Sequence, residues 1–360
     1  MKSALRILLF PFSLVYGFIT RVRNFLYDSH LLKPTTFDDL KTICIGNLCV
    51  GGAGKTPHTE YILRLLGSEY NTASLSRGYG RKTSGYFEVT PNSIPEDSGD
   101  EPLQIKRKFS NTFVAVSENR VKGIKKLTAQ NANVDVIVLD DAFQHRKIKC
   151  GLTILLTEFD SPFYEDHMMP GGRLRESAHG YLRADIIVVT KTPEYATAID
   201  LKRVMKEINP RPYQNMYFSY LKYGALFGMF DTREVINTPQ RLFKYSVLLL
   251  TGIANPNSIL TYVKEYANSV THKAYSDHHN FTPAEINEII TAFNAIEDTN
   301  KIIITTEKDA IRLNTYAANL KDLPIFVLPI EVDFKNKTEE FNEKITGYVR
   351  RNKIYHSRYT

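Results

Sequence analysis

Short apolar runs rich in β-branched residues alternate with segments of helical periodicity along the first half of the chain. The runs that predict strands are 41–46, 71–76, 112–117, 134–141, 152–158 and 184–191. Between them, segments 56–70 and 119–132 place apolar residues at helical spacing and predict helices. Nearly continuous apolar strands separated by helices are typical of a mostly parallel sheet covered on both faces. The pattern therefore predicts an α/β fold.

A second series of strands and helices follows the segment INPRPYQ, which marks a plausible domain boundary. The strands predicted there are 245–253, 301–309 and 325–332, with helices at 256–267 and 337–351. Because single cores rarely grow beyond about 250–300 residues, 360 residues favour two domains. The predicted division is an apolar helix at 1–23, a larger domain at 24–210, a smaller α/β domain at 211–335, and a C-terminal helix with a basic tail at 336–360.

The N-terminal segment is apolar and carries basic residues on both sides. The window between Arg6 and Arg21 holds 14 residues, mostly apolar. As a helix it is about 21 Å long, which is shorter than the ~30 Å hydrocarbon core of a bilayer. One interpretation is a buried helix that packs on the first domain. The other, which we favour because no acidic residue precedes Asp28, is an interfacial helix that lies against anionic headgroups.

Charge and cysteine content narrow the classes of partner and compartment. Lys and Arg total 46 against 39 Asp and Glu, a formal net charge of +7. A modest basic excess favours a polyanionic partner without choosing among nucleotide, nucleic acid and membrane. No run of alternating basic and aromatic residues indicates a nucleic-acid binder. The three cysteines form no CxxC pair, which favours a reducing compartment.

The sequence GNLCVGGAGKTP at 46–57 lies between a predicted strand and a predicted helix, the context of a phosphate-binding loop. The residues expected to contact the nucleotide are Gly51, Gly52, Ala53, Gly54, Lys55 and Thr56. The glycines let backbone N–H groups approach phosphate oxygens, the lysine supplies a charge, and the threonine hydroxyl can hold Mg²⁺. The usual pattern has glycine where Cys49 stands, so the match is degenerate at its first position. The larger domain at 24–210 is accordingly predicted to bind ATP.

An apolar strand that ends in acid is the second signature of such enzymes, because the carboxylate reaches the Mg²⁺ shell. Here the strand 134–141 ends in Asp140 and Asp141, which alternate across the strand. One carboxylate is therefore expected to face the metal. The alternative is that Asp141 only caps the following turn.

Further candidate groups lie in loops. Asp100 precedes a helix predicted at 101–109, so it is either a functional acid or an ordinary helix cap. Arg77 and Arg81 flank Gly-Tyr-Gly and form either an anion clamp or a solvated turn.

A second pair of loops carries Arg173, Arg175 and Glu176, in PGGRLRE, and the adjacent His278 and His279. The histidines precede TPAE, a capping box that predicts a helix start. Without a second ligand cluster, acid–base or structural roles are favoured over metal binding.

Seven motifs in order resemble the lipid A 4′-kinase (tetraacyldisaccharide 4′-kinase) family of Gram-negative bacteria. They are GNLCVGGAGKTP, SRGYGRK, SGDEP, LDDAFQH, PGGRLRE, SDHHNF and TEKDAIRL, and the resemblance extends to about residue 315. It implies a phosphate-loop domain joined to a smaller α/β domain. It also implies ATP-dependent, Mg²⁺-assisted phosphorylation of the 4′-hydroxyl of a membrane-bound acylated glucosamine disaccharide, the lipid A precursor.

The resemblance also implies roles for individual residues. Lys55 and Thr56 match the nucleotide and Mg²⁺ residues, and Asp140 and Asp141 match the acidic strand end at the metal. Asp100 matches the acid that activates the sugar hydroxyl, and His278 matches the histidine that supports it. Gln144 and Arg120 match polar positions near the nucleotide, and Glu176 matches one near the metal. Ala142 departs from the family pattern, which has glycine there.

Activity and location follow from the same resemblance. The chain is expected to be a phosphotransferase at the cytoplasmic face of the bacterial inner membrane, peripheral or monotopic, with an anionic membrane surface as a partner. The alternative is a membrane-associated regulatory or partitioning ATPase. Such proteins carry lysine directly before the glycine pair of their loop, where this chain has Val50.

Overall fold

The computed structural model describes residues 2–351. Its larger lobe is built from the following elements: α1 (Lys2–Asp28), β1 (Lys41–Asn47), α2 (Lys55–Leu66), β2 (Thr72–Ser76), β3 (Phe87–Val89), α3 (Pro95–Ser98), α4 (Asp100–Lys108), β4 (Phe113–Val116), α5 (Arg120–Gln130), β5 (Val136–Asp140), β6 (Leu152–Glu158), β7 (Ile186–Thr190), α6 (Ala198–Ile208), β8 (Asn215–Tyr223), β15 (Ile330–Phe334) and α11 (Thr338–Arg350). The smaller lobe contains β9 (Leu226–Gly228), β10 (Val235–Ile236), β11 (Ser246–Thr251), α7 (Asn257–Tyr266), β12 (Ser269–Ala274), α8 (Pro283–Asn294), β13 (Lys301–Thr306), α9 (Glu307–Leu313), α10 (Ala317–Leu320) and β14 (Ile325–Leu328).

The larger sheet has nine strands in the order β15-β8-β7-β6-β1-β5-β2-β4-β3. The strands from β8 to β4 pair in parallel, and β15 and β3 are antiparallel at the two edges. This mostly parallel sheet confirms the predicted fold class. The register pairs Ile45 with Asp140, so the carboxyl ends of β1 and β5 lie side by side.

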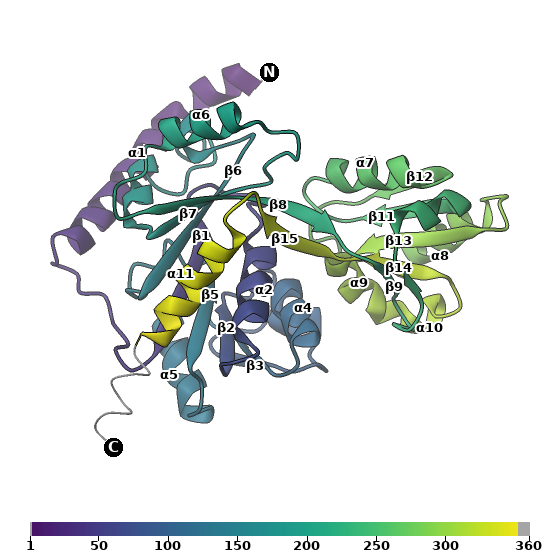
Figure 1. Cartoon of the computed structure of the whole chain (residues 1–360), viewed down its shortest axis with the longest axis horizontal. Coiled ribbons are helices and arrows are strands. Elements are labelled where there is room, and N and C mark those ends of the chain that lie inside the picture. Colours follow the sequence, from purple (N-terminus) through teal and green to yellow (C-terminus); the bar gives the residue numbers. More distant parts are fainter. Residues whose placement is uncertain (1, 352–360) are drawn as a thin grey trace.

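The smaller sheet has six strands in the order β10-β9-β14-β13-β11-β12. Strands β8 and β15 run together from the larger sheet towards it, and no other paired strands connect the two lobes in Figure 1. Both strands fall within the range 211–335 that the sequence assigns to the smaller domain, yet they pair with the larger sheet. The division at residues 210 and 335 stays a prediction.

Alternate residues of the central strands serve two different cores. Ile43 and Ile45 of β1 pack into the cluster on the α2 side of the sheet, whereas Cys44 packs into the cluster around α5. All three are buried, as are the residues of β5. This accounts for the unbroken apolar runs, because a parallel strand covered on both faces has no solvent side.

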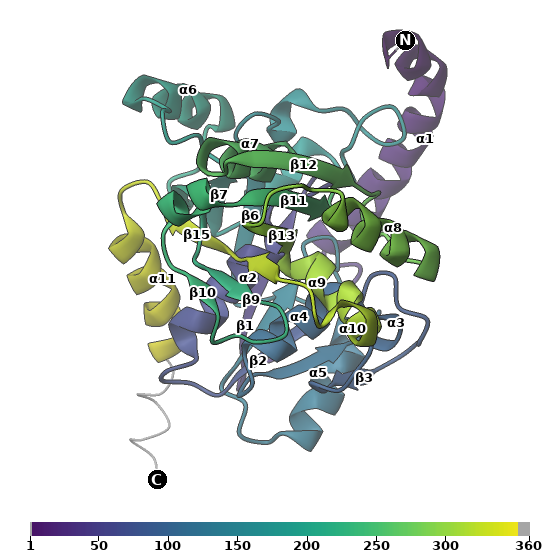
Figure 2. The same ribbon diagram turned by 90° about the vertical axis from the view of Figure 1, so that its right-hand side faces the viewer.

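The two terminal helices lie on the larger lobe. Helix α1 continues to Asp28, five residues beyond the predicted segment, and begins at the end of the lobe opposite to where α11 ends (Figures 1 and 2). None of the helices within residues 2–351 combines the length and the hydropathy needed to span a bilayer. Helix α11 packs against α2, and the predicted basic tail at 352–360 lies outside the described residues.

Candidate active site

The phosphate loop connects the end of β1 to the start of α2, as the sequence predicts. Gly51 has a φ of 130° and Gly54, the residue before α2, has a φ of 81°, values that side-chain-bearing residues rarely adopt. Cys49 is not among the residues with positive φ and forms a β-bridge with Leu174. A side chain is therefore tolerated at Cys49, which explains the departure from the usual pattern.

Lys55 begins α2 and points back towards the end of β1. Its ammonium donates to Oδ1 of Asn47 at 3.3 Å and lies 3.8 Å from Oδ1 of Asp141. The side chain is 18% exposed, so the charge is held near the surface of the loop. Thr56 follows it and is buried at the first turn of the helix.

Asp140 is the last residue of β5 and is buried. Burial, together with the nearby carboxylates of Glu101 and Asp141, raises its pKa to about 7. Its Oδ1 has no hydrogen-bond partner within the described chain. An unpaired carboxylate oxygen in a dry environment is costly, so this oxygen is available to a ligand.

Asp141 lies just past the strand, with a φ of 49°, so the expected alternation of the two aspartates across one strand is wrong. Arg175 donates from Nη2 to Oδ1 at 2.8 Å and from Nη1 to Oδ2 at 3.2 Å. Burial opposes the charged form, but Lys55 and Arg175 hold the pKa of Asp141 below its ordinary value. Ala142 has no positive φ, so the left-handed residue of this turn is the aspartate and alanine fits beside it.

Gln144, Glu176 and Arg120 surround the same strand ends. The Gln144 amide donates to the carbonyl of Asn47 at 2.8 Å and to Oε1 of Glu176 at 3.1 Å. Arg120 is buried and donates to the carbonyls of Ser117, at 2.8 Å, and Asp140, at 3.2 Å. The structure thus gathers these predicted residues around the phosphate loop, and their roles there stay predictions.

Asp100 lies at the start of α4, but its side chain caps nothing, since the capping position is Gly99. Instead Arg312 donates from Nε to Oδ1 at 2.9 Å and from Nη2 to Oδ2, and Nδ1 of His278 lies 2.9 Å from Oδ2. Burial opposes ionisation, yet the hydrogen bonds from His278 and Arg312 keep the pKa of Asp100 below its ordinary value. The interpretation of Asp100 as a helix cap is therefore wrong.

His278 follows β12 and has a φ of 58°, an uncommon conformation for a residue with a side chain. Its Nε2 lies 2.9 Å from the ammonium of Lys308, which has protons to donate and no lone pair. Because Lys308 donates to Nε2, the imidazole proton is assigned to Nδ1 and points to Asp100. His279 turns elsewhere and bonds to Glu285 at 2.9 Å. The adjacent histidines therefore do not share a ligand.

Arg312, Lys308 and Arg175 are site residues that the sequence did not single out by role. Lys308 and Arg312 are four residues apart on α9, which places them on one helix face. That spacing in TEKDAIRL was the available signal, but nothing local indicated that this face meets Asp100, which is more than 200 residues away.

The SRGYGRK loop separates its two arginines. Arg81 forms an ion pair with Glu118, between β4 and α5, and donates to the carbonyl of Gly85 at 2.6 Å, so it ties the loop to a neighbouring segment. Arg77 is exposed. Neither original interpretation, a clamp or a solvated turn, describes both residues.

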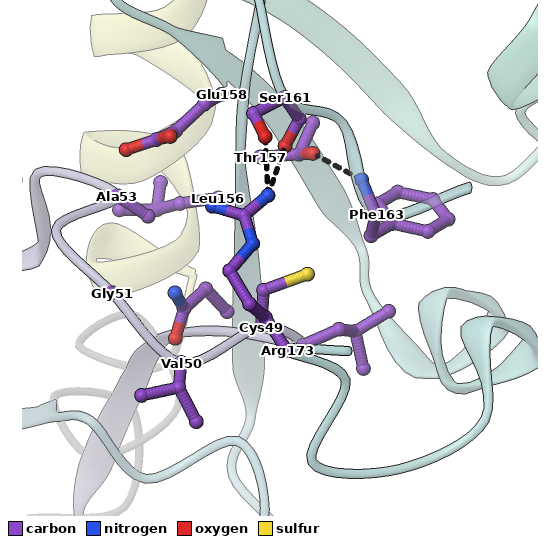
Figure 3. Close-up of a pocket in the computed structure, with 12 residues that line it drawn as sticks. Cys49, Val50, Gly51, Ala53, Leu156, Thr157, Glu158, Ser161, Phe163 and Arg173 are labelled. Carbon is purple, nitrogen blue, oxygen red and sulfur yellow. Dashed lines mark hydrogen bonds between the residues drawn. The ribbon is translucent and has the colours of Figure 1, made fainter. Parts of the chain in front are cut away.

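A small pocket lies beside the phosphate loop, on the β6 side of β1 and away from Asp140. Figure 3 shows Arg173 extending along it and bonding to Ser161, opposite Gly51 and Ala53 of the loop. Glu158 lies at its rim. The loop is thus bordered by acid on the β5 side and by this pocket on the other.

Comparison with known proteins agrees with this architecture. The family described as Tetraacyldisaccharide-1-P 4′-kinase matches residues 5–350. A tetraacyldisaccharide 4′-kinase of Bacteroides thetaiotaomicron is 43% identical and aligns with 96% of this chain and 93% of its own. That of Flavobacterium johnsoniae is 41% identical, with 97% and 99% covered. The crystal structure of LpxK from Aquifex aeolicus in complex with ATP has a TM-score of 0.74 at 28% identity and covers 96% of this chain and 99% of that one. The chain therefore belongs to the tetraacyldisaccharide-1-P 4′-kinase family.

Proposed function

We propose that this protein transfers the γ-phosphoryl group of ATP to the 4′-hydroxyl of a tetraacyldisaccharide 1-phosphate, a step of lipid A biosynthesis. Family membership supports the reaction. The observation that carries it onto these residues is the buried, unpaired oxygen of Asp140 beside the lysine of a phosphate loop. The alternative of a regulatory or partitioning ATPase gains no support from the family match.

Mg²⁺ fits the residues present. The hydroxyl of Thr56 and the carboxylates of Asp140 and Asp141 are hard oxygen donors, which Mg²⁺ prefers. No group of three His, Cys, Asp or Glu side chains among residues 2–351 forms a metal cage. Mg²⁺ usually relies on one or two carboxylates plus substrate phosphates, so a sparse protein site suits it. Bound there, Mg²⁺ would supply positive charge that offsets the negative charge of the phosphates.

Asp140 is the better ligand of the two aspartates, because both oxygens of Asp141 already accept from Arg175. Glu176 is less available, since Asn24 and Arg183 donate to its two oxygens. Lys55 and the loop N–H groups bind the phosphates. They stabilise the charge that spreads over the transferred group.

Asp100 is proposed to accept the proton of the 4′-hydroxyl, and His278 to orient it. An aspartate of low pKa is a weak base, but phosphoryl transfer has a loose transition state in which the attacking oxygen loses its proton late. Orientation therefore matters more than basicity. His278 and Arg312, from the smaller lobe, hold the carboxylate in one position on α4.

A membrane-bound acceptor requires a membrane-bound enzyme surface. Large apolar side chains along α1, including Leu8, Phe12 and Phe18, are more than half exposed. We propose that this face lies in the cytoplasmic leaflet of the inner membrane. The net charge of +7 favours an anionic surface.

The test is transfer of ³²P from [γ-³²P]ATP to a detergent-dispersed lipid A disaccharide precursor. Lys55→Ala should lower kcat/KM at least about a hundred-fold, since one preorganised charge on the transferred group contributes roughly 3 kcal/mol. The exposed Lys125→Ala on α5 serves as the control for loss of a lysine. Near-parental activity of Lys55→Ala would show that the loop is not the catalytic phosphate site.

A further inference from the structure

Helix α1 has the reverse of the usual amphipathic arrangement. Between the half-buried Leu9 and Leu26, the residues that face the protein are spaced three or four apart and are small or polar: Ser13, Tyr16, Gly17, Thr20 and Asn24. The exposed residues are large and apolar: Leu8, Phe10, Phe12, Leu14, Val15, Phe18, Ile19, Val22 and Phe25. A helix held by hydrophobic burial would show the opposite pattern. The inner face must therefore contribute by hydrogen bonding.

Three hydrogen bonds join this inner face to one segment, residues 171–176, which we call the strap. Ser13 Oγ accepts from the N–H of Gly171 at 2.9 Å. Tyr16 donates from its hydroxyl to the carbonyl of Arg175 at 2.9 Å. The amide of Asn24 donates to Oε2 of Glu176 at 2.7 Å. The strap is thus fixed along one side by a helix about 150 residues distant in sequence.

Along its other side the strap holds the phosphate loop. The carbonyl of Arg173 accepts from the N–H of Val50 at 2.7 Å, and the N–H of Arg175 donates to the carbonyl of Leu48 at 2.8 Å. The Arg175 guanidinium also bonds to Asn47 and Asp141. One short segment therefore connects α1 to both the loop and the acidic strand end.

The hydrogen bond from Asn24 satisfies the one oxygen of the buried Glu176 carboxylate that has no other donor among the described residues. Glu176 is 0% exposed, and its Oε1 accepts from Arg183 at 2.9 Å and from Gln144 at 3.1 Å. Among the hydrogen bonds of the described chain, Oε2 accepts only from Asn24. Removing that donor leaves a buried carboxylate oxygen unpaired, which shifts either the strap or the carboxylate.

We propose that Tyr16 and Asn24 are positioning residues of the nucleotide site, so that the helix which offers its outer face to lipid also sets the affinity for Mg·ATP. The inference rests on the proposed function, because it takes the strap-bordered loop as the nucleotide site. The residues act through Arg175 and Glu176 and contact no substrate themselves. By linkage, any change that lipid makes to α1 alters nucleotide binding, and the reverse holds equally.

The experiment measures the Kd of Mg·ATP for full-length, detergent-solubilised protein without lipid substrate, by calorimetry. Asn24→Asp replaces the donor by a charge that repels Glu176, and it should weaken binding at least tenfold. Tyr16→Phe removes one hydrogen bond, keeps the ring and should weaken binding about threefold. The matched control is Phe18→Ser on the outer face of the same helix, which should leave the Kd unchanged.

Kinetics separate this role from general loosening of the helix. The KM for ATP should rise in Asn24→Asp while the KM for lipid changes little, and Phe18→Ser should show the reverse. An Asn24→Asp protein that binds Mg·ATP within twofold of the parent overturns the proposal, and so does equal weakening by Phe18→Ser. If Asn24→Asp does not fold, Tyr16→Phe decides, because an unchanged Kd there also overturns it.

A reference variant distinguishes this failure from failure of the proposed function. Lys55→Ala must weaken Mg·ATP binding in the same titration. If Lys55→Ala binds like the parent, the phosphate-loop assignment is wrong and the coupling falls with it. If Lys55→Ala binds poorly and Asn24→Asp binds normally, only the coupling is overturned.

Discussion

Asp140 and Asp141 are adjacent in sequence, yet their carboxylates have opposite electrostatic environments. Burial and the carboxylates of Glu101 and Asp141 raise the pKa of Asp140 to about 7 against the opposing charges of Lys55 and Arg120, whereas Lys55 and Arg175 outweigh burial at Asp141 and lower its pKa. Sequence reasoning placed Asp140 at the strand end correctly, whereas Asp141 lies just past the strand. It could not separate them, because the separating residue, Arg175, comes from a loop 34 positions away.

His58 is a second residue whose environment sets its charge. Its Nδ1 bonds to the carbonyl of Gly54 at 2.7 Å and its Nε2 to the hydroxyl of Ser219 at 2.9 Å. Nδ1 must donate to the carbonyl, and in the neutral ring Nε2 then accepts from Ser219. Burial lowers its pKa from 6.5 to about 4, against the opposing effect of the bond to Gly54.

A lowered histidine pKa makes the folded state lose stability in acid. The contribution of His58 to the free energy of unfolding is complete above pH 6.5 and is lost as the pH falls towards 4. The loss amounts to about 3 kcal/mol, at about 1.4 kcal/mol per pKa unit. In His58→Gln this loss should vanish. Urea unfolding of both proteins at several pH values measures this effect. As the pH falls from 6.5 towards 4, the parent should lose about 3 kcal/mol more of its unfolding free energy than the variant. A difference independent of pH would contradict the assignment.

At the scale of elements, three helices meet at one partly buried ion cluster between the lobes. Lys108 of α4 lies 2.7 Å from both Glu60 of α2 and Glu307 of α9. Gln104 also donates to Glu60 at 2.7 Å. Burial raises the pKa of Glu60, and Lys108 opposes that rise. The cluster thus ties the helix of the phosphate loop to the helix that carries Arg312.

Removing the lysine should leave two carboxylates facing each other. Breaking a buried pair by removing one partner typically costs 3–5 kcal/mol. Because Lys108 is 23% exposed, we expect a loss of about 3 kcal/mol in unfolding free energy for Lys108→Met, measured with urea. Adding Glu60→Gln and Glu307→Gln should recover most of it. A triple variant no more stable than Lys108→Met would show that the charges are not what couples these helices.

The contact between α4 and the smaller lobe also predicts how the proposed base behaves. Asp100→Asn cannot accept a proton, so kcat should fall by about 10²–10⁴-fold while Mg·ATP binding is retained. His278→Ala should lower the same rate. The double variant should lose far less than the product of the two losses, because the pair acts as one unit. The rate is measured by ³²P transfer at saturating ATP and lipid.

The control for these single and double variants is Asp97→Asn on the neighbouring α3. The Asp97 side chain does not take part in the hydrogen bonds of Asp100 with His278 and Arg312. It should keep parental kcat. An active Asp100→Asn enzyme would refute the base assignment. Multiplicative losses would keep Asp100 as the base and show that His278 acts independently of it.

Elements were predictable to the extent that local pattern determines them. The strand at 152–158 and the capping box of Thr282 and Glu285 were confirmed as predicted. The segment 301–309 was only partly a strand, because Thr306 caps a helix that begins at Glu307. Strand β8 was missed, since its buried run, Met216–Ser219, directly follows the turn signal INPRPYQ and is followed by partly exposed residues. The contacts of Asp100 could not be predicted, because they depend on how the two lobes pack together and no local sequence pattern carries that information.

At the scale of the whole molecule, α1 exposes a continuous apolar face of a kind that surfaces in contact with water rarely have. Phe12 and Phe18 are 64% and 69% exposed on this face. Phe243, on the smaller lobe, is 57% exposed and offers a matched residue far from α1 in the sequence. Isolated exposed aromatic residues are ordinary on protein surfaces, whereas a row of them along one helix indicates a contact.

Replacing both phenylalanines should therefore release the protein from membranes without unfolding it. Burying a phenylalanine side chain contributes about 1.5–3 kcal/mol, so Phe12→Ser with Phe18→Ser should lower partitioning onto phosphatidylglycerol–phosphatidylethanolamine vesicles at least about tenfold. Sedimentation with vesicles measures this, and the melting temperature should not change because both residues are exposed. Phe243→Ser should partition like the parent. An equal loss in Phe243→Ser, or none in the double variant, would show that α1 does not form the membrane-binding surface.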